Sequence, residues 1–191
     1  MLTKPMSLSS LAIAALCWGA LVVPAYAETE DEMSLPNGPE PTSILADIVR
    51  DPTDLPPPIG PRAAQSVVLS LTTVEVTGQL ADGTTYRYWT FDGKVPGPFL
   101  RVRVGDSVEV RLKNAADSLM MHNVDFHAVT GPGGGGAATM AAPGETKSFT
   151  FKAQHPGLYV YHCATPPAAM HIAKGMYGLI LVEPETGLPK V

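Results

Sequence analysis

Short runs of apolar and β-branched residues follow one another along the chain from Val67 onward. In several of them apolar and polar positions alternate, which is the two-residue period of a half-buried strand. ADGT follows the first run and is a typical hairpin turn. Helical periodicity is almost absent, and no internal repeat is visible at solenoid spacing. The runs are SVVLSLTTVEVTG, TYRYWTF, LRVRVGDSVEVRL, KSFTFKA, GLYVYHC and YGLILVE. This pattern predicts an antiparallel, all-β sandwich or barrel.

The first 27 residues have the pattern of a secretory signal peptide. Lys4 precedes the apolar stretch LAIAALCWGALVV, and the small-residue sequence AYA ends at Ala27. A membrane anchor is the alternative, but the apolar stretch is short and acidic residues follow it directly. We therefore expect an exported protein with its signal (1–27) removed.

Residues 28–62 are rich in proline and acidic side chains, which predicts an extended, poorly ordered lead-in. Within the lead-in, residues 42–50 could form one or two helical turns. The strand runs then place a single folded domain at 63–185, and a chain of 191 residues is long enough for one such core. The net charge of −5 and the lack of a basic cluster argue against nucleic-acid binding.

Only one of the two cysteines is expected in the mature chain. Cys17 lies inside the signal, and Leu16 stands where a lipoprotein signal would have a small residue. Cys163 is then alone in an exported protein, where cysteines are normally paired. Metal ligation is a good reason for an unpaired cysteine in that setting.

The segment GPGGGG (131–136) has the letters of a dinucleotide-binding fingerprint. That fingerprint requires a preceding strand and a helix that opens after it. Here AATMAAPGETKSF follows and leads through a proline into another strand run. We interpret the segment as a flexible loop without a phosphate-binding role.

Side chains that can bind a metal occur in two segments, and in both segments they are divided between the two faces of a strand in the same way. His162 and Cys163 are adjacent, so in a strand they face opposite sides. If MHNVDFHAV is extended, His122 and His127 also face opposite ways, while Asp125 and His127 share a face. The alternation therefore predicts two separate metal sites connected by one stretch of backbone.

The first predicted site joins His122 and Cys163, and His171 and Met176 downstream complete it. Two imidazoles, a thiolate and a thioether suit a blue-copper electron-transfer centre. The second site joins His162 to Asp125 and His127, and two imidazoles leave room for water or a substrate on the metal. A single histidine is more often a packed core residue, but four of the five histidines belong to these groups.

The motifs YRYWTFDGKVPGP, HNVDFHAVTG, GLYVYHCA and MHIAKGMYGLILVEPETGLPKV resemble the first cupredoxin domain of copper-containing, nitric-oxide-forming nitrite reductases. The resemblance covers about residues 67–191. It implies a cupredoxin-like Greek-key sandwich and a periplasmic enzyme. It also implies type 1 copper at His122, Cys163, His171 and Met176, and type 2 copper at His127 and His162.

In this resemblance, Asp125 handles protons at the substrate, and an electron passes from the type 1 to the type 2 centre through Cys163 and His162. Nitrite then gives nitric oxide and water. The electron donor would be a small cupredoxin or a cytochrome c.

Members of that family carry a second cupredoxin domain and form homotrimers, in which a neighbouring subunit completes each type 2 site. In this sequence residues 186–191 would begin the linker to that domain. We therefore expect an N-terminal half or fragment, incomplete as an enzyme by itself.

Two other functions remain open from the sequence. A single-domain cupredoxin electron carrier would need only the first site and would leave Asp125, His127 and His162 unexplained. A small multicopper oxidase that reduces oxygen would need more histidine-rich motifs than five histidines can supply without partners.

Overall fold

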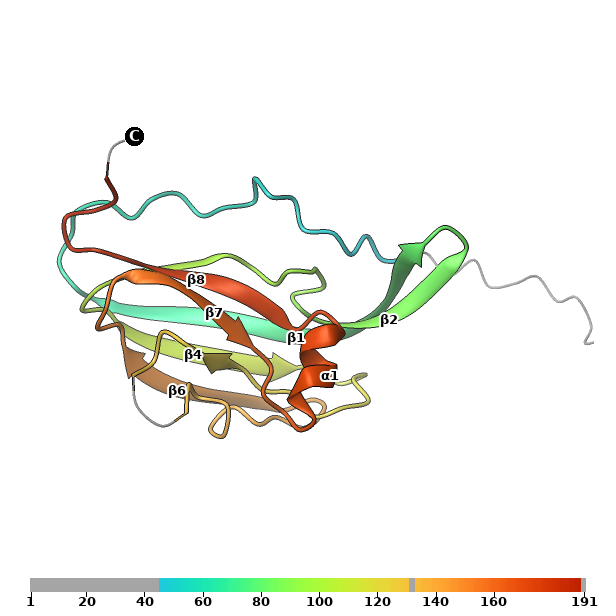
Figure 1. Ribbon diagram of the computed structural model, residues 1–191. Helices are drawn as coiled ribbons and strands as arrows, with labels where there is room; N and C mark the ends of the chain where they lie inside the picture. Colours follow the sequence, from blue (N-terminus) through green and yellow to red (C-terminus); the bar gives the residue numbers. More distant parts are fainter. Residues whose placement is uncertain (1–44, 131–132, 190–191) are drawn as a thin grey trace, which may run out of the picture. The chain divides into compact units, whose positions relative to one another are not determined.

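The computed structural model describes residues 45–130 and 133–189. In these ranges the chain folds into two four-stranded sheets that pack as layers, with one short helix at one end (Figure 1). The elements are β1 (Ser66–Ala81), β2 (Thr84–Phe91), β3 (Leu100–Arg103), β4 (Ser107–Asn114), β5 (Asp125–Phe126), β6 (Thr146–Lys152), β7 (Gly157–His162), α1 (Ala168–Ala173) and β8 (Tyr177–Glu183). The predicted all-β sandwich is confirmed, but its sheets are mixed and not purely antiparallel, because β1 pairs with β4 and β3 with β8 in parallel.

The first sheet has the order β2-β1-β4-β6. β1 and β2 form the expected antiparallel hairpin, and Gly83 in its turn has a φ of 70°, a conformation that glycine adopts without steric cost. β1 runs parallel to β4, and β6 is antiparallel to β4. The long β1 strand thus connects the hairpin to the centre of the sheet.

The second sheet has the order β3-β8-β7-β5. The run LRVRVGDSVEVRL supplies one strand to each sheet, because β3 pairs in parallel with β8 while β4 pairs with β1. The Gly105–Asp106 turn is therefore the point where the chain crosses between the layers. β5 is short and pairs with the end of β7.

Inward side chains of both sheets form one apolar core. On β7 the alternation is clear, since Tyr161 is fully buried while Leu158 and Val160 are exposed. The Tyr161 hydroxyl donates a hydrogen bond of 2.6 Å to the Pro98 carbonyl, which satisfies its polar end inside the core. The fully buried large side chains include Leu71, Phe91, Val108, Leu112, Phe126, Met176 and Ile180.

The lead-in differs from expectation over its described part. Residues 45–50 are extended and form no helical turn, because their backbone pairs with the domain: the Ala46 amide donates to the Thr77 carbonyl and the Arg50 amide to the Val95 carbonyl. Ile48 is buried by this pairing. The helical prediction for this segment was wrong because backbone pairing and burial of Ile48 outweigh the weak local preference.

The signal peptide predicted at 1–27 lies outside the described residues. Across residues 45–130 and 133–189, no helix is both long enough and apolar enough to cross a membrane.

Asp106 fastens the end of the lead-in to the crossing between the sheets. The two oxygens of its fully buried carboxylate accept hydrogen bonds of 2.7 and 2.6 Å from the Arg62 guanidinium. The amides of Gln65 and Arg103 also donate to this carboxylate. Burial by itself would raise the pKa of Asp106, but these donors outweigh burial and hold that pKa below its usual value.

We predict that Asp106→Ala lowers the free energy of unfolding by about 2–4 kcal/mol at neutral pH, because Arg62 and two amides lose their acceptor. Since the folded pKa lies below the unfolded one, the carboxylate stabilises the fold above about pH 4 and this contribution disappears as pH falls through the folded pKa. Urea unfolding of wild type and variant at neutral and acidic pH measures both effects. A difference that stays constant with pH would contradict the assignment.

Candidate metal centres

The first cluster lies inside the sandwich, at the end that carries α1. His122, Cys163 and His171 are fully buried, and one ligand atom from each lies within 4.8 Å of the others. Nδ1 of His122 is 3.2 Å from Nδ1 of His171, and Sγ of Cys163 is 3.3 Å from the same His171 atom. Three groups that can bind a soft metal therefore converge on one point.

Backbone hydrogen bonds hold the segments of this cluster together. His122 exchanges two backbone hydrogen bonds with Ala141. Cys163 follows β7 directly, and its amide donates to the Met176 carbonyl over 3.1 Å. The Met176 amide in turn donates to the carbonyl of His171, which lies in α1. Met176 is fully buried beside these residues, so the structure brings all four predicted ligands to one region.

The electrostatics of the first cluster fit a metal cation. Burial, with the neighbouring His122 ring, lowers the pKa of His171 to about 4, and burial also lowers the pKa of His122. Both imidazoles are therefore neutral at neutral pH, as metal ligands must be. Burial raises the pKa of the Cys163 thiol, so a thiolate here needs a cation beside it. The donor set supplies the place for that cation.

Three other side chains or backbone groups contact the residues of the first cluster. The Asn123 amide donates to Sγ of Cys163 over 3.4 Å, and the thiol lies 3.4 Å from the Thr165 hydroxyl. The Trp89 ring packs 4.6 Å from the His171 ring and 5.5 Å from the His122 ring, measured between ring centres. The cluster is thus enclosed by side chains that limit the motion of its ligands.

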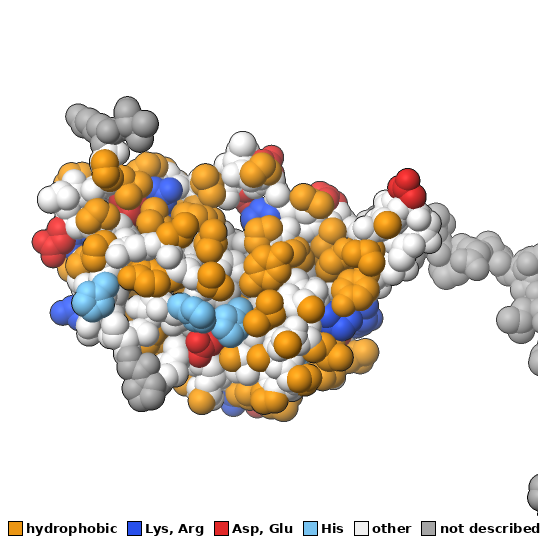
Figure 2. Space-filling model, viewed as in Figure 1, with side chains coloured by type: hydrophobic (Ala, Val, Ile, Leu, Met, Phe, Trp, Pro, Cys, Tyr) orange, Lys and Arg blue, Asp and Glu red, His pale blue; other side chains and the backbone are white. Residues whose placement is uncertain are grey.

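The second cluster lies on the outer side of the β3-β8-β7-β5 sheet. Asp125, His127 and His162 each place one ligand atom within 4.8 Å of the others. The two Nε2 atoms of His127 and His162 are 3.1 Å apart. His127 is exposed, and Figure 2 shows histidine side chains at the surface next to an acidic side chain and among hydrophobic ones. This arrangement leaves the cluster open to small molecules.

A hydrogen bond selects the tautomer of His162. Its Nδ1 lies 3.0 Å from the Cys163 carbonyl oxygen, which can only accept, so Nδ1 carries the hydrogen. In the neutral ring Nε2 then has a free lone pair directed at the cluster. Metal-bound histidines commonly have this second hydrogen bond to a carbonyl. The geometry fits a metal at Nε2 of His162.

Residues 133–136, the described part of the glycine-rich segment and called the glycine loop below, hold Asp125. Its Oδ2 accepts hydrogen bonds from the amides of Gly134 (2.9 Å) and Gly136 (3.3 Å), and β5 pairing places Asp125 opposite His162. No helix opens after this loop among the described residues, which agrees with setting the dinucleotide reading aside. The flexible-loop interpretation missed this carboxylate-binding role, which only the folded arrangement reveals.

Two further residues at the clusters were not singled out in the sequence. Asn123 adjoins His122, and its side chain donates to the Gly136 carbonyl and accepts from the Ala164 amide over 2.6 Å, so it ties the glycine loop to the segment after Cys163. Glu75, on β1, has Oε1 3.3 Å from Nε2 of His122. Strand alternation could have found Glu75, because it shares the inward parity of buried residues two and four positions earlier.

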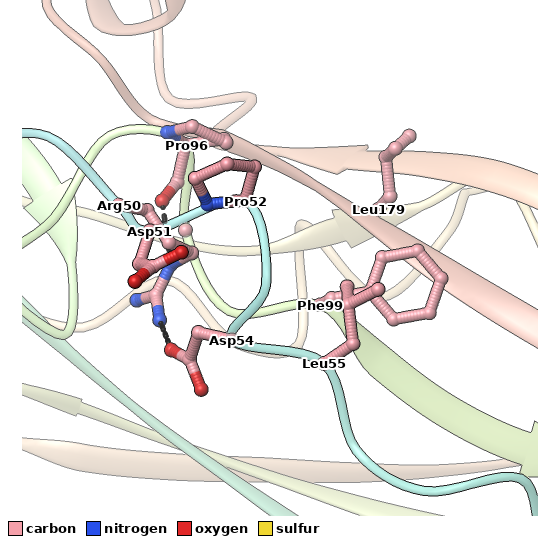
Figure 3. Close-up of a pocket in the computed structure, with 9 residues that line it drawn as sticks. Arg50, Asp51, Pro52, Asp54, Leu55, Pro96, Phe99 and Leu179 are labelled. Carbon is pink, nitrogen blue, oxygen red and sulfur yellow. Dashed lines mark hydrogen bonds and ion pairs between the residues drawn. The ribbon is translucent and has the colours of Figure 1, made fainter.

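A separate pocket lies between the lead-in and β8 (Figure 3). It has a volume of about 210 Å³, and apolar side chains such as Phe99, Leu55 and Leu179 line much of it. The Arg50 guanidinium at its wall is already engaged, with the Pro96 carbonyl at 2.9 Å and with Asp54. None of the lining residues belongs to either cluster, so this pocket has no direct part in their chemistry.

Comparison with known proteins gives consistent results. A family model described as multicopper oxidase matches residues 72–187. The copper-containing nitrite reductase of Neisseria meningitidis serogroup A is 59% identical over 138 residues, which are 72% of this chain and 36% of that protein. The copper-containing nitrite reductase of Alcaligenes xylosoxydans xylosoxydans is 42% identical over 150 residues, 76% of this chain and 45% of that protein. The chain thus spans less than half the length of these relatives.

Solved structures agree with this result. The copper nitrite reductase from Nitrosomonas europaea superposes with a TM-score of 0.58 and 45% identity, covering 66% of this chain and 45% of that one. A multicopper oxidase crystal structure gives a TM-score of 0.58 and 33% identity, covering 65% and 45%. Proteins described as copper nitrite reductase and as multicopper oxidase therefore share the fold of this chain.

We predict that Gly134→Ala lowers the free energy of unfolding by about 1–3 kcal/mol, because the new methyl group would meet backbone atoms. An added Cβ would lie 2.4 Å from the Phe126 carbonyl oxygen and 2.6 Å from Oδ1 of Asp125. Gly136→Ala is the matched control, since its Cβ would meet only side-chain atoms, at 3.1 Å or more. Denaturant unfolding should show that Gly134→Ala is less stable than Gly136→Ala. Equal stabilities of the two variants would refute the tight packing of the loop.

Proposed function

Because the chain belongs to the multicopper oxidase family, we propose that it is the part of a copper-containing nitrite reductase that holds its electron-transfer copper and part of its nitrite site. The fold is the cupredoxin-like sandwich that the resemblance implied. The observation that carries the proposal is the pair of clusters joined through two neighbouring residues, Cys163 and His162. One cluster is buried and sulfur-containing, and the other is open and lacks sulfur.

The residues fit copper at both places. His122, Cys163, His171 and Met176 would hold type 1 copper, and His127 and His162 would hold type 2 copper. Bound copper would supply the one-electron redox chemistry that the reaction needs. The ligand atoms of His122, Cys163 and His171, and those of Asp125, His127 and His162, lie within 4.8 Å of one another in each group, so binding needs little rearrangement of these residues.

The chain itself offers a short electron route between the clusters. Cys163 belongs to the buried cluster and His162 to the open one, so a single peptide unit joins the two ligands. The hydrogen bond from Nδ1 of His162 to the Cys163 carbonyl adds a second contact across the same step. A pure electron carrier needs no such connection, and this favours the enzyme over the carrier.

Conversion of nitrite to nitric oxide takes up one electron and two protons, and one N–O bond breaks as water leaves. Asp125 lies where a proton would be needed, with one carboxylate oxygen within 4.8 Å of a ring nitrogen of His127 and of His162. The amides of Gly134 and Gly136 donate to Oδ2 of Asp125 and hold the carboxylate in place. We infer that Asp125 delivers a proton to the oxygen that leaves.

The second cluster has too few ligands to fill the positions around a metal, and this indicates a partner. Two imidazoles leave metal positions unfilled, and exposed Leu158, Val160 and Leu179 lie on the outer face of the sheet that carries His162. Apolar side chains grouped in this way suit a contact with another subunit. We propose a homotrimer in which a neighbour completes the site. A small cupredoxin or cytochrome c would donate the electron, in the periplasm to which the signal peptide would direct the chain.

We predict that Cys163→Ser abolishes the intense visible absorption of the copper-loaded protein, because that band requires a copper–thiolate bond. His155→Ala, which changes an exposed histidine outside both clusters, is the control and should keep the band. Visible spectroscopy with metal analysis tests both variants. A Cys163→Ser protein that retains the band would show that the first site is assigned to the wrong residue.

We predict that Asp125→Asn, in the complete protein, keeps its copper but loses about 100- to 10,000-fold in nitrite turnover. Asparagine preserves the shape but cannot transfer the proton, and positioned proton transfer is worth about this much. Asp117→Asn, at an exposed aspartate in a loop, is the matched control. Nitric-oxide production and copper content are measured together. Turnover equal to wild type with intact copper would remove Asp125 from the mechanism.

A further inference from the structure

Glu75 is a buried carboxylate beside the first cluster. It lies on β1 with inward parity, and its side chain is 1% exposed. A carboxylate in such a place is costly unless several donors satisfy it. The donors around Glu75 therefore indicate what it does.

Four donors face the two oxygens of Glu75. Oε1 accepts hydrogen bonds of 2.9 Å from the amides of Leu119 and Met120 and lies 3.3 Å from Nε2 of His122. Oε2 lies 3.1 Å from Nε of Arg87 on β2. One side chain thus fixes both the backbone that leads to His122 and the ring of His122 itself.

The contact with Glu75 selects one tautomer of His122. An ionised carboxylate can only accept, so Nε2 of His122 carries the hydrogen and Nδ1 keeps its lone pair. Nδ1 is the atom that lies 3.2 Å from Nδ1 of His171, at the centre of the cluster. The carboxylate therefore directs the correct nitrogen of the ring at the metal position.

The two imidazoles of the first cluster differ in what contacts the ring nitrogen that faces away from the cluster. Nε2 of His171 is buried and has no hydrogen-bond partner among the described residues. His171 is instead packed against Trp89, with 4.6 Å between ring centres. Of the two rings, only that of His122 has a carboxylate at hydrogen-bond distance among the described residues, so a change at Glu75 acts on His122 directly and on His171 only through space.

We propose that Glu75 is the positioning residue of the first copper site, holding His122 in the Nε2–H tautomer and placing a negative charge behind this ligand. The proposal rests on the proposed function only in taking the metal to be copper. A carboxylate behind a histidine ligand increases the basicity of the ring and its metal affinity. It also favours the more positive, oxidised metal, so Glu75 lowers the reduction potential.

Three variants of the full-length protein separate charge from hydrogen bonding. Glu75→Gln keeps one oxygen acceptor of similar shape and removes the charge. Glu75→Ala removes both. Glu109→Gln, at a carboxylate on β4 paired with Arg111, makes the same charge change away from both clusters and is the control. Long-range ¹H–¹⁵N NMR of the copper-free proteins gives the His122 tautomer, and copper titration and redox titration give affinity and potential.

We expect the Nε2–H tautomer of His122 to dominate in wild type and in Glu75→Gln, and to lose its dominance in Glu75→Ala. The copper dissociation constant of Glu75→Ala should rise about 10- to 100-fold. Glu75→Gln should have a higher reduction potential than wild type, while Glu109→Gln should match wild type throughout.

An unchanged tautomer in Glu75→Ala, or an unchanged potential in Glu75→Gln, would overturn the proposal and leave Glu75 as a support of the Leu119–Met120 backbone alone. Failure of the wild-type protein to bind copper would instead refute the proposed function. In that case the copper-free NMR measurement still decides whether Glu75 positions His122.

Discussion

Successive side chains of a strand point to opposite faces, and the two clusters depend on this constraint at the end of β7. The thiol of Cys163 lies in the core, and the imidazole of His162, one residue earlier, lies on the outer side of the sheet. A shift of the pairing by one residue would exchange the two faces. The register of β7 with β5 and β8 therefore determines which residues can share a metal.

The two clusters have different surroundings, and the difference follows from their places in the sandwich. The inner cluster is buried and enclosed, with Trp89 against its imidazoles and with its thiol at a raised pKa caused by burial. Such a site suits a metal ion that changes its oxidation state without binding a substrate. The outer cluster includes the exposed His127, so small molecules can reach it. In the proposed function the buried cluster is the redox site and the open cluster is the substrate site, and electron transfer to a substrate requires the two to be close.

Carboxylates and backbone amides organise both clusters from outside. Asp125 is held by two glycine amides, and Glu75 by two amides of the loop before His122. In each case the carboxylate accepts hydrogen bonds from a loop and also lies close to a histidine of its cluster. Asn123, next to His122, bonds both to the glycine loop and to the segment after Cys163. The candidate ligands are thus held from outside by two separate groups of polar contacts.

The sequence alone determined the all-β fold, the strands and the parity of the metal-capable residues, because these depend on a two-residue period that is visible in the chain. It did not determine that residues 45–50 pair with the domain, that a short helix carries His171, or that Glu75 and Gly134 contact residues of the clusters. Those features depend on contacts between segments far apart in the chain, where burial and hydrogen bonding outweigh local preference. Only the tertiary structure brings Glu75 to His122, 47 residues away, since no local pattern encodes that distance.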